Sequence, residues 1–192
     1  MVAADSTFLT LLIKPDAKAP LDPATRAPID RLRDRIENLI ADLVAQDETI
    51  IIPTPVLSEV LVLAGDAGPA YLDEIHGSRL FKVMPFDERA AIELAAVETE
   101  ARGSGSKRAG SEGTWAKVRF DRQIVAIAKV NNVCRIYSDD DGLGKFAKRC
   151  GIDVVRSWEL PLPPAKQLPI AYGEDGTKDD QQGQGGAGPA EG

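Results

Sequence analysis

The sequence predicts an α/β protein, a three-layer α/β/α sandwich around a central and mostly parallel sheet. Short apolar or β-branched segments alternate along the chain with longer segments that have helical periodicity. Such alternation is typical of parallel strands joined by crossover helices. The chain has 192 residues, 43% of them hydrophobic and 28% charged. This is the composition of one globular domain with its own core, and it excludes a wholly disordered chain.

The first half of the chain is expected to alternate strands with helices. The segment 49–53, T-I-I-I-P, is a continuous β-branched run, as in a strand buried on both faces. Pro55 suits the first turn of the helix that follows. In the segment 26–46, apolar residues recur at helical spacing between charges. The expected strands are residues 2–4, 49–53 and 81–86, and the expected helices are residues 7–13, 26–46, 54–64 and 71–76.

The second half continues the alternation and then changes character. Asp87 is expected to cap a helix rich in alanine and glutamate. The expected helices are residues 88–102, 120–130 and 143–150, and the expected strands are residues 133–137 and 153–158. The glycine- and serine-rich segment 102–114 predicts a mobile loop within a domain of residues 1–158. Residues 159–192 are rich in proline, glycine and glutamine and predict a disordered tail.

The sequence also indicates where the protein works. No stretch approaches the roughly 20 apolar residues of a membrane-spanning helix. The apolar run at residues 8–13 lacks a cationic lead-in and a small-residue cleavage site, so a secretory signal is not expected. Two cysteines, Cys134 and Cys150, make neither a disulfide framework nor a zinc site. A cytoplasmic protein without a membrane partner is therefore predicted.

Charge is unevenly distributed along the chain. The net charge of −7 argues against a protein that coats nucleic acid non-specifically. Residues 102–149, however, carry 11 basic and 5 acidic side chains, whereas residues 1–101 carry 9 basic and 18 acidic ones. The middle of the chain is therefore expected to meet a polyanion although the whole chain is acidic.

Carboxylates follow or flank several expected strands. Asp5 follows the first strand, Glu59 lies in the apolar run V-L-S-E-V-L-V-L, and Asp121 lies near the start of a helix. Residues 139–141 are three aspartates that follow the strand C-R-I-Y. Parallel sheets place their sites beyond the carboxyl ends of the strands, where the chain order reverses. Acids gathered there would repel one another unless a hard divalent ion held them together, and Glu59 would be costly to bury unpaired.

Each acid taken alone also has a simpler interpretation. A solvated surface carboxylate is the commoner outcome for an isolated Asp or Glu. Helical periodicity would be able to turn Glu59 outward, and Asp121 would suit the N-terminal end of a helix dipole. The aspartates at 139–141 would also serve to cap the helix that follows them. Only the joint pattern of the acids favours a site.

Taken in order, the acids carry four marks of a known family. The marks are Asp5 followed by Ser6, Glu59 within P-V-L-S-E-V-L, Asp121 opening D-R-Q-I-V-A-I-A, and Ser138 two residues before Asp140 in I-Y-S-D-D-D-G-L. Over residues 1–158, this pattern resembles the PIN domain family of metal-dependent ribonucleases. That family includes the toxins of bacterial toxin–antitoxin pairs.

The resemblance implies a PIN-like sandwich whose acids meet in one pocket, and an endoribonuclease that depends on Mg²⁺ or Mn²⁺. The catalytic and metal-binding residues that it implies are Asp5, Glu59, Asp121 and Asp140. Register favours Asp140 over Asp139 and Asp141, although Gly142 stands where the family often has a further Asp. Ser6 and Ser138 would hydrogen-bond the ligands or a substrate phosphate. The implied partners are an RNA substrate, an antitoxin protein and a second copy of the chain.

The basic middle of the chain supplies candidate RNA contacts. These candidates are Lys107, Arg108, Trp115, Lys117, Arg119, Arg122 and Lys145. Trp115 would stack on an unpaired base. A non-catalytic PIN-like module that binds RNA or protein is the alternative to an enzyme. A phosphatase is not indicated, because it would need Asp-x-Asp after the first strand, where this chain has Asp5-Ser6-Thr7.

Overall fold

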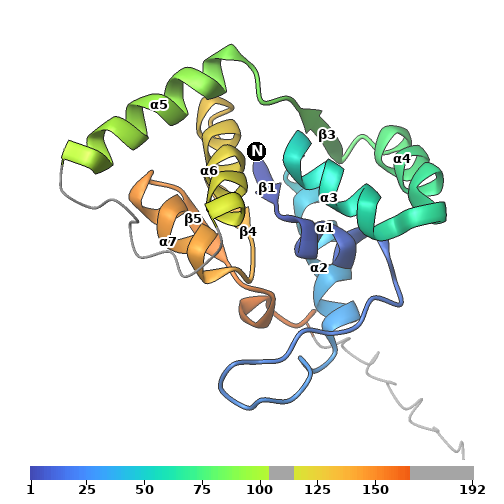
Figure 1. The fold of residues 1–192 in the computed structure, drawn as a ribbon. Helices are drawn as coiled ribbons and strands as arrows, with labels where there is room; N and C mark the ends of the chain where they lie inside the picture. The colour runs from blue at the N-terminus through green and yellow to red at the C-terminus, as the bar shows by residue number, and fades with distance from the viewer. Residues whose placement is uncertain (104–114, 165–192) are drawn as a thin grey trace, which may run out of the picture.

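The computed structural model describes residues 1–103 and 115–164 of the chain, and within them one parallel sheet flanked by helices (Figure 1). The strands of this sheet follow the order β3-β2-β1-β4-β5. They are β1 (Val2–Ala4), β2 (Ile50–Pro53), β3 (Phe81–Met84), β4 (Arg135–Tyr137) and β5 (Asp153–Val155). Every neighbouring pair is parallel. The predicted α/β fold class is confirmed.

The helices between these strands lie close to the predicted segments. They are α1 (Ser6–Ile13), α2 (Leu32–Ala45), α3 (Thr54–Ala64), α4 (Gly68–Gly77), α5 (Glu88–Gly103), α6 (Trp115–Val130) and α7 (Asp141–Arg149), with short 3₁₀ turns η1 (Gly65–Ala67) and η2 (Ser157–Glu159). Asp87 accepts a hydrogen bond from the Ala90 N–H at 3.0 Å, so it caps α5 as predicted. None of the described helices is long and apolar enough to cross a membrane.

The centre of the sheet is fully buried. The side chains of β1 and the three isoleucines of β2 are almost inaccessible to solvent, which confirms a strand covered on both faces at residues 50–52. Strand β1 pairs with β2 on one side and with β4 on the other. The chain order therefore reverses at β1, and the carboxyl ends of β1 and β4 lie together. Crevices at such a reversal are the usual binding sites of open parallel sheets.

The predicted helix at 26–46 is wrong in its first six residues. Helix α2 begins at Leu32, because Arg26 and Arg31 have φ of 59° and 50°, in the left-handed region that no α-helix contains. Pro28 between them cannot donate a backbone hydrogen bond to a helix interior. Ile29 is nevertheless buried. The apolar periodicity correctly identified a core residue but placed it in the wrong secondary structure.

Other boundaries also differ from the prediction. Helix α5 runs to Gly103, two residues into the segment expected to be a loop, and α6 begins at Trp115, five residues before the predicted helix start. At the other end, Leu160 is only 2% exposed and its carbonyl accepts a hydrogen bond from Arg35. The packed domain therefore extends beyond residue 158, into the expected tail. The remainder of that tail, residues 165–192, and the loop residues 104–114 with Lys107 and Arg108 lie outside the described residues.

Candidate active site

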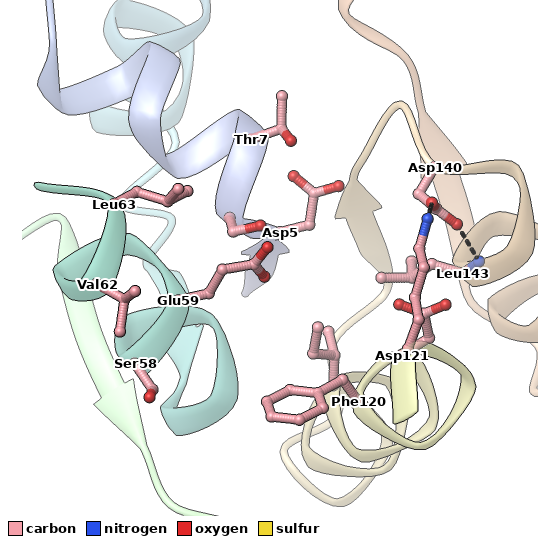
Figure 2. A pocket seen from close by; sticks show the side chains of 13 residues that line it. Asp5, Thr7, Ser58, Glu59, Val62, Leu63, Phe120, Asp121, Asp140 and Leu143 are labelled. Atoms are coloured by element: carbon pink, nitrogen blue, oxygen red, sulfur yellow. Dashed lines mark hydrogen bonds and ion pairs between the residues drawn. The ribbon is translucent and has the colours of Figure 1, made fainter. Parts of the chain in front are cut away.

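A cavity of about 560 Å³ opens at the carboxyl ends of β1 and β4, and all four predicted acids line it (Figure 2). Its lining is Asp5, Ser6, Thr7, Ser58, Glu59, Val62, Leu63, Lys117, Phe120, Asp121, Ile124, Asp140 and Leu143. Asp5 and Glu59 face Asp121 and Asp140 across the opening in Figure 2. Residues separated by more than a hundred positions in sequence thus share one cavity.

Asp5 is held by the end of β1 and the start of α1. Its Oδ1 accepts a hydrogen bond from the Phe8 N–H at 2.7 Å, and its own N–H donates to the Tyr137 carbonyl at 3.1 Å. The side chain is 6% exposed. Burial, reinforced by repulsion from Asp139 and Asp140, raises the pKa of Asp5 to about 6, against the lowering effect of hydrogen bonds from Ser138 and Phe8.

Glu59 reaches the cavity from the exposed face of α3. Helical spacing places Ser58, Glu59, Val62 and Leu63 toward the opening, while Val56 and Val60 enter the core. Glu59 is exposed, so of the two interpretations the outward-turned side chain is the one that the structure shows, and no cost of burial arises. The apolar neighbours that suggested burial are themselves 78% and 72% exposed at Val62 and Leu63. They form an apolar wall of the cavity.

Asp121 approaches from the opposite wall, on the second turn of α6. Partial burial raises the pKa of Asp121 to about 6, and repulsion from Asp140, Asp5 and Glu59 adds to the shift, while Lys117 opposes it. The negative charges of the other three acids therefore make ionisation of Asp121 less favourable. This mutual destabilisation is typical of functional sites, although structural networks show it too.

The three consecutive aspartates have different surroundings. Asp139 accepts hydrogen bonds from the Ser157 N–H at 2.7 Å and the Ser157 hydroxyl at 2.5 Å. Asp141 is largely exposed and pairs with Arg156. Only Asp140 lines the cavity. Its Oδ1 caps α7 by accepting from the Leu143 N–H at 2.8 Å, and its Oδ2 lies 2.5 Å from Lys117 Nζ. Burial opposes ionisation of Asp140, but these hydrogen bonds outweigh it and lower the pKa.

Ser138 connects two of these acids. It is fully buried, its hydroxyl hydrogen-bonds Asp5, and its Oγ accepts from the Asp140 N–H at 3.1 Å. The register Ala4 to Tyr137 between β1 and β4 brings Ser138 beside Asp5. This is the kind of contact that the sequence predicted for Ser138. Ser6 lines the cavity at the first turn of α1.

Arg156 is a supporting residue that sequence reasoning missed. Its guanidinium donates to the Ser138 carbonyl at 2.9 Å and to Asp141 at 3.0 Å, so it holds the loop between β4 and α7. Gly144 lies against it, and a Cβ at that position would come within 2.7 Å of Arg156 Nη2. The only signal in the sequence was the unusual pair of glycines, Gly142 and Gly144, at the start of a helix.

The candidate RNA contacts are scattered. Lys117 lines the acidic cavity and Lys145 is exposed on α7. Trp115 and Arg119 line a second hollow, of about 450 Å³, between α5 and α6. The prediction that Arg122 contacts RNA is wrong. Arg122 is 5% exposed and pairs with Glu98, and its guanidinium carbon lies 5.8 Å and 5.5 Å from the ring centroids of Trp115 and Phe146. It is not available to a phosphate.

The donor chemistry of the cavity suits a hard divalent ion, because carboxylate oxygens from four elements line one open space with Lys117 beside them. As they stand, these carboxylates lie too far apart for three of them to coordinate one ion. Among the residues described, no group of three or more His, Cys, Asp or Glu side chains is close enough to hold a metal ion. The residues fit such an ion in type and in charge, and their side chains would have to converge to bind it.

Comparison with known proteins shows a likeness of fold. One chain of VapBC2 from Rickettsia felis, bound to a DNA fragment from their promoter, has a TM-score of 0.52 at 16% identity, covering 81% of this chain and 98% of that chain. One chain of DNA-bound VapBC from Salmonella typhimurium has a TM-score of 0.51 at 17% identity, covering 82% and 99%. The expected PIN-like sandwich is confirmed. No family model and no curated protein matches the sequence.

Proposed function

We propose that this protein is a Mg²⁺- or Mn²⁺-dependent endoribonuclease that hydrolyses RNA phosphodiesters. The observation that carries the proposal is the arrangement of Asp5, Glu59, Asp121 and Asp140 around one open cavity at the sheet reversal. A PIN-like fold supports it. The four carboxylates repel one another, and Lys117 offsets only part of this repulsion, since the pKa of Asp121 is still raised to about 6.

The four acids form two pairs with different tasks in this proposal. Asp5 and Asp140 are held in place by backbone hydrogen bonds, so they would give fixed oxygen donors. Glu59 and Asp121 stand on helices, one on each wall of the cavity, and would move toward the ion to complete its ligands. Ser138 orients Asp5. When bound, Mg²⁺ or Mn²⁺ supplies Lewis acidity, which lowers the pKa of water and neutralises charge developing on phosphate oxygens.

The apolar part of the cavity supports a single-stranded substrate. The ring of Phe120 is 47% exposed and lines the cavity next to Asp121, facing Val62 and Leu63 of α3 (Figure 2). An unpaired base is able to stack on such a ring, whereas a base inside a duplex is already stacked on its neighbours. Phe120 therefore joins Trp115 as a candidate base platform, in a better position than Trp115 relative to the acids.

The proposal is tested with purified full-length protein, single-stranded RNA and Mn²⁺. We expect cleavage that requires the metal and falls to background in Asp121→Asn, which keeps the size of the side chain but removes its charge. Asp73→Asn is the matched control, because Asp73 is exposed on α4 and does not line the cavity. Cleavage that persists unchanged in Asp121→Asn, after removal of contaminating nucleases, would contradict the proposal.

A non-catalytic PIN-like module that binds RNA or protein is the second candidate. The specific observation in its favour is the spacing of the acids, since no group of them within the described residues is close enough to hold an ion. The two functions are separated by turnover: the module would bind RNA without Mn²⁺-dependent products.

We also propose a toxin role with an antitoxin partner, and a homodimer. The likeness to chains of two VapBC assemblies supports this choice. A toxin would arrest growth when expressed alone, and Asp121→Asn would abolish the arrest. Analytical ultracentrifugation of the purified chain would test the homodimer.

A further inference from the structure

Lys117 brings a positive charge into the acidic cavity from within the chain. It lies one helical turn before Asp121 on α6, so both side chains project from the same face of that helix. Its Nζ is 2.5 Å from Asp140 Oδ2, across the gap between α6 and α7. The hydrogen bond to Asp140 raises the pKa of the Lys117 ammonium, and attraction by the carboxylates of Asp140, Asp121 and Glu59 adds to this rise.

This contact occupies one of the two oxygens that Asp140 would offer to a metal. Asp140 Oδ1 accepts the capping hydrogen bond from Leu143, and Oδ2 accepts from Lys117. An ion that binds at Oδ2 leaves the helix cap in place, so Oδ2 is the favoured point of approach. The ammonium and a divalent ion would compete for the same position, because both are attracted by the same carboxylates.

We propose that Lys117 is an internal counter-ion of the acidic cavity, and that a divalent cation binds by displacing its ammonium from Asp140 Oδ2. The inference rests on the proposed metal-dependent function. It provides a physical reason why the described acids are spaced too widely to hold an ion while Lys117 stands among them. Lys117 is thus a positioning residue that sets how much divalent ion is needed to assemble the site.

The test is a calorimetric titration of Mn²⁺ into metal-free full-length protein. Lys117→Met keeps a long apolar stem and removes the charge, so we expect Mn²⁺ to bind about tenfold more tightly than to the wild type. Lys117→Arg restores a cation and should return the affinity toward that of the wild type. Lys82→Met is the control for net charge, because Lys82 is exposed on β3 and does not line the cavity.

Thermal unfolding gives a second readout that a merely structural lysine would not produce. In chelator, Lys117→Met should unfold at a lower temperature than the wild type, since its acids have lost a counter-ion. Saturating Mn²⁺ should then raise its Tm by more than it raises that of the wild type, because tighter binding gives a larger shift. A structural role alone would lower the Tm in both conditions and leave the metal affinity unchanged.

The outcomes separate this inference from the function on which it rests. Mn²⁺ binding that depends on Asp121 but is equally strong in the wild type and in Lys117→Met overturns the role of Lys117 and leaves the nuclease proposal intact. Weaker binding in Lys117→Met also overturns it. Absence of Mn²⁺ binding in every variant overturns both proposals.

Discussion

Asp121 and Arg122 are consecutive residues of α6, and the structure gives their charges opposite treatment. Arg122 turns toward α5, where it is buried between two aromatic rings and paired with Glu98. Asp121 turns toward the cavity, where burial, reinforced by repulsion from three other carboxylates, raises its pKa to about 6. The first region balances its charge and the second keeps an excess of one sign. The difference indicates which of the two is built to hold the fold and which to bind a ligand.

The largest change in stability should come from removing the ion pair between Arg122 and Glu98. Arg122→Met would remove the ion pair of the buried guanidinium with Glu98 and its contacts with two aromatic rings, and should lower the free energy of unfolding by about 3 kcal/mol, measured by urea denaturation. Arg119→Met on the same helix is the control, because Arg119 is exposed and should change stability by less than about 0.5 kcal/mol. Equal effects of the two substitutions would mean that the Arg122 pair is not a structural element.

The excess of carboxylates around the cavity should make the stability of the protein depend on pH. Burial raises the pKa of Asp5 and of Asp121 from 3.8 to about 6. The folded chain therefore binds protons more tightly than the unfolded chain, so this contribution is fully present below pH 3.8 and is lost as the pH rises through about 6. In chelator, the Tm should fall between pH 5 and pH 7.

Two variations sharpen this prediction. Asp121→Asn should reduce the slope of Tm against pH, because one of the two titrating groups is gone. Mn²⁺ should oppose the fall, because it binds the ionised carboxylates. A Tm in chelator that rises steadily from pH 5 to pH 7, with no smaller slope in Asp121→Asn, would show that the acids do not destabilise one another.

The smallest effect should come from the support behind the cavity. In Gly144→Ala, the new methyl group would press on the far end of Arg156, which is able to move. We expect a loss of about 1 kcal/mol in unfolding free energy and a modest fall in RNA cleavage, since Arg156 holds the loop that carries Asp140. Gly151→Ala is not a suitable control, because Gly151 has a φ of 76°. Ala116→Gly, on the exposed side of α6, measures the background cost of a small helical change.

The sequence identified Asp5 and Asp140 because each lies at a boundary that local rules can locate, whereas Glu59 and Asp121 lie inside helices and were implied by the family resemblance. Strand ends, a proline-initiated helix and the start of α7 were all predictable from neighbouring residues. The choice of Asp140 among three aspartates was likewise a matter of register, and Asp140 is the one that lines the cavity. For Glu59, the predicted position was right and the physical reason was wrong, because its apolar neighbours face solvent rather than the core.

Long-range pairing was beyond local rules. Nothing near Arg122 in the sequence indicates that Glu98 lies opposite it, so a structural arginine was predicted to contact RNA. The link from Lys117 to Asp140 and the clamp formed by Arg156 also join residues that are far apart in sequence. The hydrogen bond from Arg35 to the Leu160 carbonyl likewise joins residues that are distant in sequence. In each case the partner is chosen by packing of helices and loops, not by residues nearby.

The double duty of Asp5 and Asp140 has a consequence for judging related proteins. Each of these carboxylates caps the first turn of a helix as well as facing the cavity. In a homologue without catalytic activity, loss of either carboxylate would therefore still destabilise the start of α1 or α7. Their persistence in a homologue would say little about whether that homologue is an enzyme. Glu59 and Asp121 stand inside helices and cap nothing, and their loss or retention would be the more telling record.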